Sequence, residues 1–545
     1  MNRQALLRRW FFVALAGIVA LVVLSTTLLT VRGGEDRAGW FSDMVQVINL
    51  EPLPVAFEAR FIDLDGQVVY TFTDTLQPGR ADIYWPAAMP TPLPPTFSGT
   101  LVISAPGQVA MEVIHFAKTI TDSNTVLEGV DSERLSDYSI VPIDKCVTIG
   151  IHNVSELAAG GYLDIFDYNG LPVGTIDLGM LDPQETIIVR PLYSGFPLDI
   201  VGMGIIYSTQ PIEVTVWRIC NGAGAFAASP EGYTDLALPL VPTHSVGLVT
   251  STLWLQNISG IMATSVGISY SDGTSETLLI GPHGNAIISS PFTDTAQAAL
   301  INSEQPLAAY VLMESRKTGQ EGSFAYRGIG LEEATNAIAL PLLFGGYAGW
   351  RTGDHLWVQN VGAEAATITI RYTAAPTGTT TWQQGVVAAG DVWRVDTPAG
   401  LGQLAGAIAQ ADQPIVAVAG SVATGLKANA EVDDHWLLYR GANYTPTCEL
   451  VTGIDFTWSP TLPIIGEGVW FSATLAGSEP VSLTWNFGDG GSAMGEVVSH
   501  VYHLVGNHVV TLSAVNCLGF GSDAAAHLLD VRPGFTLYLP LMVRP

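Results

Sequence analysis

The chain has 545 residues and a formal net charge of −28, with 48% hydrophobic and only 13% charged residues. Such acidity argues against nucleic-acid binding, because phosphates require Lys and Arg. The apolar content argues against a disordered chain. Gly and Pro, 57 and 32 residues, are abundant, as expected for many short strands joined by turns. The length suggests about four to five domains.

The N-terminus carries an apolar run that could interact with a membrane. Residues 10–31 lack charge, and Arg3, Arg8 and Arg9 precede them. A run of about 20 apolar residues can cross a bilayer, and basic flanks stay in the cytoplasm. We therefore expect a cytoplasmic segment at 1–9, a transmembrane signal-anchor helix at 10–31, and the bulk of the chain outside. The alternative is a cleaved signal peptide and a secreted protein.

An internal repeat organises the next 400 residues. The phrase Leu356-Trp-Val-Gln-Asn360 has a near copy at Leu253-Trp-Leu-Gln-Asn257, and weaker copies end at Asn49 and Asn153. The four asparagines are spaced by 104, 104 and 103 residues. So regular a period predicts tandem structural units. We place them at residues 44–118, 138–222, 236–330 and 338–441.

The four units share an order of strand and turn signals. Alternating apolar residues predict a strand pair in each unit, joined by a turn such as Asn169-Gly170. A second turn follows 25 to 30 residues after the Asn, and a Pro that interrupts the late strand follows after 49 to 58 residues. Units three and four both begin with Leu-Pro-Leu. The fold class expected is all-β, with tandem Ig-like β-sandwich domains.

These repeats resemble tandem β-sandwich repeats in surface proteins of Chloroflexota-type bacteria. The matching residues are Gln359-Asn360-Val-Gly362 and Ser303-Glu-Gln-Pro-Leu-Ala308. Unit one departs from the pattern, because Ala105-Pro106 stands where the others have Gln-Pro. The resemblance implies an exported β protein and no specific activity.

Residues 446–531 carry a different signature. It consists of Leu483-Thr-Trp-Asn-Phe-Gly-Asp-Gly490, His500-Val-Tyr502 and the strand ending at Asn516. This pattern resembles a PKD domain, which implies an Ig-like sandwich and a non-catalytic module of an exported protein. The residues that carry the motif are expected to be structural: Trp485, Phe487, Gly488, Asp489, Gly490, His500, Tyr502 and Asn516.

Simple geometry explains most of that motif. Trp485 and Phe487 lie two residues apart, so both face one side of a strand and can fill a core. Gly488 and Gly490 permit a positive φ, and Asp489 can bond its own backbone in the turn. The tail at 532–545 repeats Leu-Pro-Leu. It is either a sorting signal or a terminal strand.

The four cysteines fall into two consecutive pairs, each inside one expected domain. In an oxidising exterior the simplest pairing is Cys146 with Cys220 and Cys448 with Cys517. The alternative is buried free thiols. There is no CxxC, so a zinc ribbon is not expected.

Known catalytic motifs are missing from the sequence: HExxH, GxSxG, a P-loop and GxGxxG after a strand. Asp433-Asp434-His435 is read as a solvated turn rather than a metal site. His500, His503 and His508 are read as structural. Asp63 to Asp74 fails as a calcium loop, because its sixth residue is Val68. We therefore expect no enzyme activity, no catalytic, cofactor-binding or metal-ligating residues, and no cofactor.

Two further residue types have a structural and a functional interpretation. Asn153, Asn257 and Asn443 lie in glycosylation triplets, but local backbone bonding explains such strand-end asparagines. Trp254 and Trp357 could stack on sugars if exposed, although core packing is favoured.

The sequence thus favours a membrane-anchored, extracytoplasmic protein with a structural or adhesive role at the bacterial cell surface. The alternative is a non-catalytic carbohydrate- or protein-binding accessory protein of an exported hydrolase system. The membrane, through the N-terminal helix, and surface polysaccharide or other surface proteins are the candidate partners, and nucleic acid is not.

Overall fold

The structure is a computed structural model of the chain, in which two compact parts are described separately, Met1–Thr445 and Pro446–Pro545. The residues that it describes are 22–29, 42–51, 53–84, 93, 97, 99–116, 125–128, 130–131, 135–197, 200–219, 223–241, 249–289, 297–315, 323–344, 351–375, 377–398, 401, 404–424, 435–444, 451–476, 481–516 and 520–533. They form strands and two short 3₁₀ helices, which confirms the predicted all-β fold.

Unit 1 contains two sheets, and in units 2 to 4 the same two sheets are joined into one by a long strand. One includes the predicted strand pair, and we call it the hairpin sheet. The other includes the strand that ends at the repeated Asn, and we call it the asparagine sheet. In unit 1 the hairpin sheet has the order β4(Val68–Leu76), β3(Val55–Asp63), β6(Gly99–Ala105), β1(Val22–Leu29), β9(Val130–Asp131). The asparagine sheet has the order β5(Ala81–Tyr84), β2(Ser42–Asn49), β7(Val109–Phe116), β8(Thr125–Glu128).

Units 2 to 4 repeat this arrangement. Unit 2 comprises β10(Ser136–Ile143), β11(Val147–Asn153), β12(Ala159–Asp167), β13(Pro172–Leu181), β14(Thr186–Val189), η3(Pro191–Tyr193), β15(Gly202–Ile219) and β16(Ala223–Ala227). Unit 3 comprises β17(Tyr233–Val241), β18(Val249–Asn257), β19(Thr264–Tyr270), β20(Ser275–Ile280), β21(Asn285–Ser289), β22(Gln297–Ser315), β23(Ser323–Arg327), β24(Ile329–Gly330) and η4(Leu331–Glu333). Unit 4 comprises β25(Thr335–Phe344), β26(Arg351–Asn360), β27(Ala366–Ala375), β28(Thr380–Val387), β29(Val392–Asp396), β30(Leu404–Thr424), β31(His435–Arg440) and β32(Ala442–Asn443).

One long strand joins the two sheets in each of units 2 to 4. The first half of β15 pairs with β10 and β12, and its second half pairs with β11 and β16. β22 and β30 do the same in their units. The predicted break at Gln-Pro is therefore wrong for these units, because the chain changes sheets there without leaving strand conformation. In unit 1 the break is real, and Ala105-Pro-Gly107 separates β6 from β7.

The structure differs from the predicted N-terminal helix over residues 22–29. These residues form β1, which pairs with β6 and β9. β1 takes the place in unit 1 that β10, β17 and β25 take in the other units, and its run of Val, Leu and Thr suits a strand. The rest of the predicted 10–31 span lies outside the described residues. Among the residues that are described, no helix is long and apolar enough to cross a bilayer.

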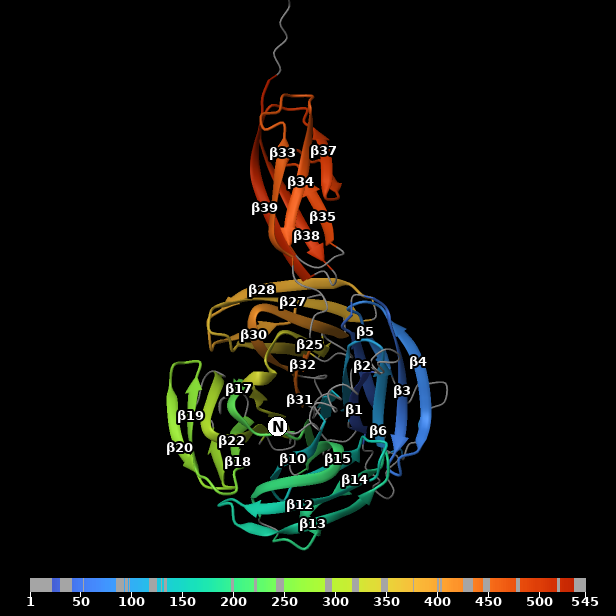
Figure 1. Cartoon of the computed structure of the whole chain (residues 1–545), viewed down its shortest axis with the longest axis vertical. Coiled ribbons are helices and arrows are strands. Elements are labelled where there is room, and N and C mark those ends of the chain that lie inside the picture. The colour runs from blue at the N-terminus through green and yellow to red at the C-terminus, as the bar shows by residue number, and fades with distance from the viewer. Residues whose placement is uncertain are drawn as a thin grey trace, which may run out of the picture. The chain divides into compact units, whose positions relative to one another are not determined.

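The four units form a closed ring rather than the expected series of independent domains. The asparagine sheet of each unit packs on the hairpin sheet of the preceding unit, and unit 1 packs on unit 4 in the same way. The last strands of the asparagine sheets contact one another in a circuit, from β8 to β16, β23, β31 and back to β8. Figure 1 shows the chain passing round this ring from blue to orange.

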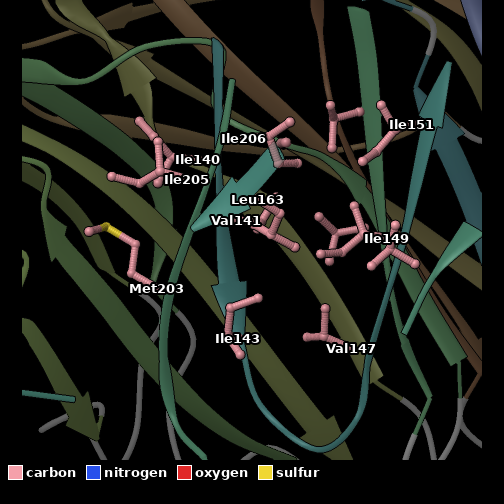
Figure 2. Close-up of a cluster of buried hydrophobic side chains, with 14 of the residues drawn as sticks. Ile140, Val141, Ile143, Val147, Ile149, Ile151, Leu163, Met203, Ile205 and Ile206 are labelled. Atoms are coloured by element: carbon pink, nitrogen blue, oxygen red, sulfur yellow. The ribbon is translucent and has the colours of Figure 1, made fainter. Parts of the chain in front are cut away.

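Packing within and between the units is continuous. Figure 2 shows the aliphatic core between the two sheets of unit 2, with residues such as Ile149, Leu163 and Ile205. The same buried cluster extends into unit 3, through Trp254 and Tyr310. Trp217 of unit 2 likewise enters the core of unit 1. Each of these cores is therefore completed by side chains of the next unit along the chain.

The C-terminal part is a separate two-sheet sandwich. One sheet has the order β33(Thr452–Ser459), β34(Gly468–Ala476), β37(Val497–Val501). The other has the order β36(Ser492–Met494), β35(Val481–Asn486), β38(Gly506–Asn516), β39(Phe520–Val531). Its own core is built around Trp485, Phe471 and Phe487.

The shared cores lead to a prediction about autonomy. Fragment 22–444 should unfold in one cooperative transition, because no unit has a complete core alone. Fragment 233–330, the third unit, should show no cooperative transition in circular dichroism or calorimetry, since its asparagine sheet would expose Trp254 and Tyr310. Fragment 446–545 serves as the control and should fold, because its core is self-contained. A cooperative transition in fragment 233–330 would contradict the shared-core ring.

Candidate functional site: the junctions between the repeats

The repeated asparagines fasten turns within each unit. Asn360 Nδ2 donates to the carbonyls of Glu364 at 2.7 Å and Val387 at 3.0 Å, while its Oδ1 accepts from Gly362 N at 2.9 Å. Asn49, Asn153 and Asn257 make the same three kinds of bond. All four side chains are fully buried. Each one joins the end of its strand to the end of the hairpin and satisfies backbone groups that would otherwise be buried unpaired.

Similar bonds occupy the side-chain nitrogens of the asparagines in the glycosylation triplets. The amide nitrogens of Asn153 and Asn257 are buried and donate to backbone carbonyls. Asn443 Nδ2 donates to the carbonyl of Glu333. In the folded protein the three nitrogens are therefore committed to structure, as the local-bonding interpretation predicts.

The Trp and Gln of the phrase face the preceding unit. Trp357 is 6% exposed and packs in the core of unit 3, while Trp254 is 3% exposed and packs in the core of unit 2. Gln256 Nε2 donates to the carbonyl of Gly202 in unit 2 at 3.1 Å. Gln359 Nε2 lies 3.5 Å from the carbonyl of Ala299 in unit 3. Core packing of the two tryptophans is thus confirmed, and the core they enter is the neighbour's.

Units 1 and 2 use other residues at the same positions. In unit 1, Gln46 stands where the later units have Trp, and its Nε2 donates to Pro341 and Ala405 of unit 4. In unit 2, His152 takes the place of the Gln. Its Nδ1 lies 2.9 Å from Thr186 Oγ1, which in turn lies 3.2 Å from Thr100 Oγ1 of unit 1. Polar groups therefore bridge all four junctions.

Turns of neighbouring units also interlock. The hairpin tip of unit 1 accepts a hydrogen bond at Leu64 O from Thr186 N of unit 2, and Tyr168 O of unit 2 accepts one from Asn285 N of unit 3. A side chain at Gly66 would place its Cβ 2.7 Å from Pro183 O. Gly66 has a φ of +78°, so both space and backbone require glycine there.

A buried ionic cluster joins units 3 and 4, and the sequence analysis missed it. Glu333 accepts from Arg327 at 2.7 and 3.1 Å, from Arg440 at 2.6 Å and from the Tyr233 hydroxyl. Breaking such a buried cluster by removing one partner is costly. The signal that could have revealed it is Tyr-Arg-Gly, which ends at Gly328 and again at Gly441.

The tyrosines of that motif support the Leu-Pro-Leu strands. β17 and β25 shift register at this phrase, as expected where Pro lacks an N–H. The Tyr326 hydroxyl donates to Leu240 O at 2.6 Å and accepts from Leu240 N at 3.2 Å. Tyr439 bonds Leu342 in the same way. Burial raises the pKa of the Tyr326 hydroxyl, which therefore remains protonated as a donor.

Of the predicted disulfide residues, only Cys146 lies in the described part of the chain. It is disulfide-bonded and buried. Its predicted partner Cys220 lies outside the described residues, as do Cys448 and Cys517. Both pairings stay predictions.

The predicted motif of the C-terminal domain comes together around one turn. Trp485 and Phe487 are buried in the core, and Gly488 and Gly490 have φ of +75° and +94°. Asp489 Oδ1 accepts from Gly491 N at 2.9 Å, and its Oδ2 lies 2.7 Å from His500 Nε2. These contacts give Asp489 a role in holding the turn together.

Aromatic contacts complete the motif. The His500 ring stacks on Phe487 with centroids 4.2 Å apart, and Tyr502 donates from its hydroxyl to Phe487 O at 3.2 Å. Asn516 ends β38. The histidine at 500 is thus held by stacking and by a carboxylate.

Among the residues described, no three His, Cys, Asp or Glu side chains are grouped so that they could hold a metal ion. Asp433 and Asp434 of the acidic cluster lie outside the described part. Asp63 instead organises a hairpin turn, because its Oδ1 accepts from the backbone N of Asp65 and Gln67.

Comparison with known proteins identifies one part of the chain. Residues 453–526 match the PKD domain family. The C-terminal sandwich is accordingly called the PKD domain below. No curated protein matches the chain.

Three solved structures illustrate the structural matches. An amphioxus IgVJ-C2 molecule is 15% identical, with a TM-score of 0.14, and the match covers 35% of this chain and 99% of that one. A tetra-tandem repeat from the extending region of a large adhesion protein is 11% identical, with a TM-score of 0.11 and coverages of 77% and 95%. The BSP domain of a biofilm-associated protein is 8% identical, with a TM-score of 0.12 and coverages of 75% and 98%. Such TM-scores are too low to indicate a shared fold.

The polar bridge at His152 predicts a pH-dependent ring. Burial lowers the pKa of His152 from 6.5 to about 4, so the folded state holds the neutral ring. As pH falls below 6.5, the unfolded chain takes up a proton that the folded chain does not, and stability is lost down to about pH 4. The full loss should be about 3 kcal/mol. Denaturant unfolding of fragment 22–444 between pH 7 and pH 4 measures it.

The matched substitution is His152→Gln, because units 3 and 4 carry Gln at this position. This variant should lose less stability between pH 6.5 and 4 than the parent. The control variant is His503→Gln, at an exposed position of the PKD domain. In the full-length chain it should leave the pH dependence of ring unfolding unchanged. Equal pH slopes for the parent and His152→Gln would refute the assignment.

Proposed function

We propose that this protein has a structural or adhesive role at the bacterial cell surface, outside the cytoplasmic membrane. Its mechanism would be display: the ring provides a rigid body whose rim meets other surfaces. The PKD domain supports export, because the family resemblance implies modules of exported proteins. The acidic, apolar composition supports a role that does not involve nucleic acid.

The observation that carries the adhesive role is the outer rim of the ring. Strands β4, β13, β20 and β28 each end the order of a hairpin sheet and lie at the periphery in Figure 1. An end strand presents backbone N–H and C=O groups to a further strand. Lys commonly blocks such pairing, yet none of the four strands contains Lys or Arg.

The side chains on these strands strengthen the argument. Each strand exposes large apolar groups, and they include Val69 at 44%, Met180 at 67%, Leu279 at 75% and Val386 at 73% exposed. Trp382 on β28 is 45% exposed. Apolar side chains gathered on an edge without Lys or Arg favour contact with other protein surfaces. The four edges would therefore supply repeated, weak contact points of one kind.

The N-terminal segment supports location at the membrane through its basic flank and apolar run. We propose single-pass attachment by this segment, with secretion after cleavage as the alternative. Residues 22–29 serve as β1 in the ring, so an embedded helix would require unit 1 to release this strand.

Location is tested on intact cells that produce the full chain. Protease added outside should release peptides from residues 42–533, and membrane fractions should retain an N-terminal peptide. Release into the medium of a chain that begins after residue 31, and therefore lacks β1, would select the secreted alternative. Full protection of the ring from protease, together with cleavage after cell lysis, would exclude a surface role.

The adhesive role is tested at the edges. The double variant Leu279→Lys and Val386→Lys changes two exposed positions on the edge strands. It should block strand addition while leaving the core unchanged. We expect cells that display the double variant to aggregate or attach at least several-fold less than cells displaying the parent at equal surface amounts. The control variant carries Lys at Leu462 and Leu504, which are exposed in the PKD domain. Equal loss in both variants, or no loss in either, would contradict adhesion through the edges.

A further inference from the structure

Cations are scarce in this chain, and most of those described are already paired. The sequence holds 22 Lys and Arg against 50 Asp and Glu. Ten of the cationic side chains lie in the described part, and seven of them form ion pairs with carboxylates: Arg60, Arg80, Arg218, Arg327, Arg394, Arg440 and Arg532. Arg371 is buried against Gly79. The two exposed cations that form no carboxylate pair within the described residues are Lys145 and Arg190.

These two cations line the same pocket. It lies on the asparagine sheet of unit 2 and has a volume of about 110 Å³. Lys145 comes from the turn between β10 and β11, and Arg190 follows β14, which pairs with β11. Thr148 contributes a hydroxyl, and Leu192 and Tyr193 from η3 complete the wall. Two segments that are distant in sequence therefore bring the unpaired positive charge to one place.

The surroundings of the pocket leave this charge available. The nearest carboxylate in sequence, Asp144, is occupied by Arg218 at 2.7 Å and by the backbone N of Cys146 at 2.7 Å. Cys146 is disulfide-bonded, which fixes the turn that carries Lys145. Tyr193 is 77% exposed, so its ring is free to cover a ligand at the pocket mouth.

The lysine of the pocket is specific to unit 2. Eight residues before the repeated Asn, unit 2 has Lys145, whereas the other units have Phe41, Val249 and Thr352. The positions that hold the ring together recur among the units, but this lysine does not. A role in ring assembly therefore does not account for it.

We propose that this pocket binds the anionic group of an acidic polysaccharide. A volume of about 110 Å³ holds a few water molecules, and thus a carboxylate or sulfate group. Lys145 and Arg190 would pair with that group, and Thr148 would donate a hydrogen bond to it. The sugar ring would lie outside the pocket against Tyr193, because an exposed aromatic face stacks on the apolar face of a pyranose. An acidic peptide would use the charges but would not need this ring.

The proposal rests on the surface role proposed above and names a ligand class for it. The full chain is passed over immobilised polygalacturonate, which carries carboxylates, and over dextran sulfate, which carries sulfate esters, at about 0.15 M salt. Unmodified dextran and poly-glutamate are the neutral and peptide controls. We expect retention on at least one acidic glycan, weaker retention on poly-glutamate, and none on dextran. Which glycan binds distinguishes carboxylate from sulfate.

Variants separate this pocket from general charge. Lys145→Ala with Arg190→Ala should weaken glycan binding by at least about tenfold, and Tyr193→Ala should weaken glycan binding but not poly-glutamate binding. The matched controls are Arg394→Ala and Tyr168→Ala, an exposed cation and an exposed tyrosine elsewhere. They should bind as the parent does.

Three outcomes would overturn the proposal. The parent chain could fail to bind either acidic glycan, the double variant could bind as tightly as the parent, or Tyr193→Ala could leave glycan binding unchanged. None of these results touches the proposed surface role, because protease release and adhesion through the edge strands do not involve the pocket. Conversely, a protected ring in intact cells would exclude the surface role even if the isolated chain bound glycan.

Discussion

The structure of residues 22–444 depends on one packing contact, made four times. The asparagine sheet of each unit carries apolar side chains on both of its faces, so one face fills its own sandwich and the other must be covered by a neighbour. In β22 every residue from Leu307 to Met313 is at most 2% exposed. The contact is head-to-tail, and a head-to-tail contact either continues into an open array or closes. Here the fourth repeat meets the first, and Gln46 and Arg371 lie at that closure.

Closure determines how the repeated residues are used. Trp357 and Gln359 act between units, and Asn360 acts within one, so a phrase of five residues serves two levels of structure. The substitutions in units 1 and 2 keep this division, because Gln46 and His152 still place polar atoms at the junctions. A polar contact across the junction therefore recurs in every unit, although the side chain that makes it differs. His152 alone of these residues titrates, and its lowered pKa gives its junction a pH dependence.

The sequence predicted the local structure well and the assembly poorly, for physical reasons. The Asn period, the turn at Gly170 and the position of Trp485 depend on nearby residues, and the structure has a positive φ at Gly170 and a buried Trp485. The ring depends on which core Trp254 enters. A pattern that predicts burial of this side chain does not say whether it enters the core of its own unit or that of the preceding unit. The strand break predicted at Gln-Pro is wrong, because a Pro at the point where the strand passes from one sheet to the other interrupts no required backbone hydrogen bond. The apolar run at 10–31 is long enough to cross a bilayer, while its segment at 22–29 also has the composition of a strand.

Differences between the four units indicate where function can reside. Residues needed for closure are constrained to bury, bridge or turn, and these roles recur in all four units. The exposed side chains of the edge strands and of the pocket at Lys145 are free of that constraint, since they face solvent and fill no core. They also differ in kind: the edges occur four times and suit weak, repeated contact with other surfaces, whereas the lysine of the pocket occurs in unit 2 alone and the pocket suits recognition of one chemical group. A closed ring allows both, because its stability comes from the junctions and leaves the rim to vary.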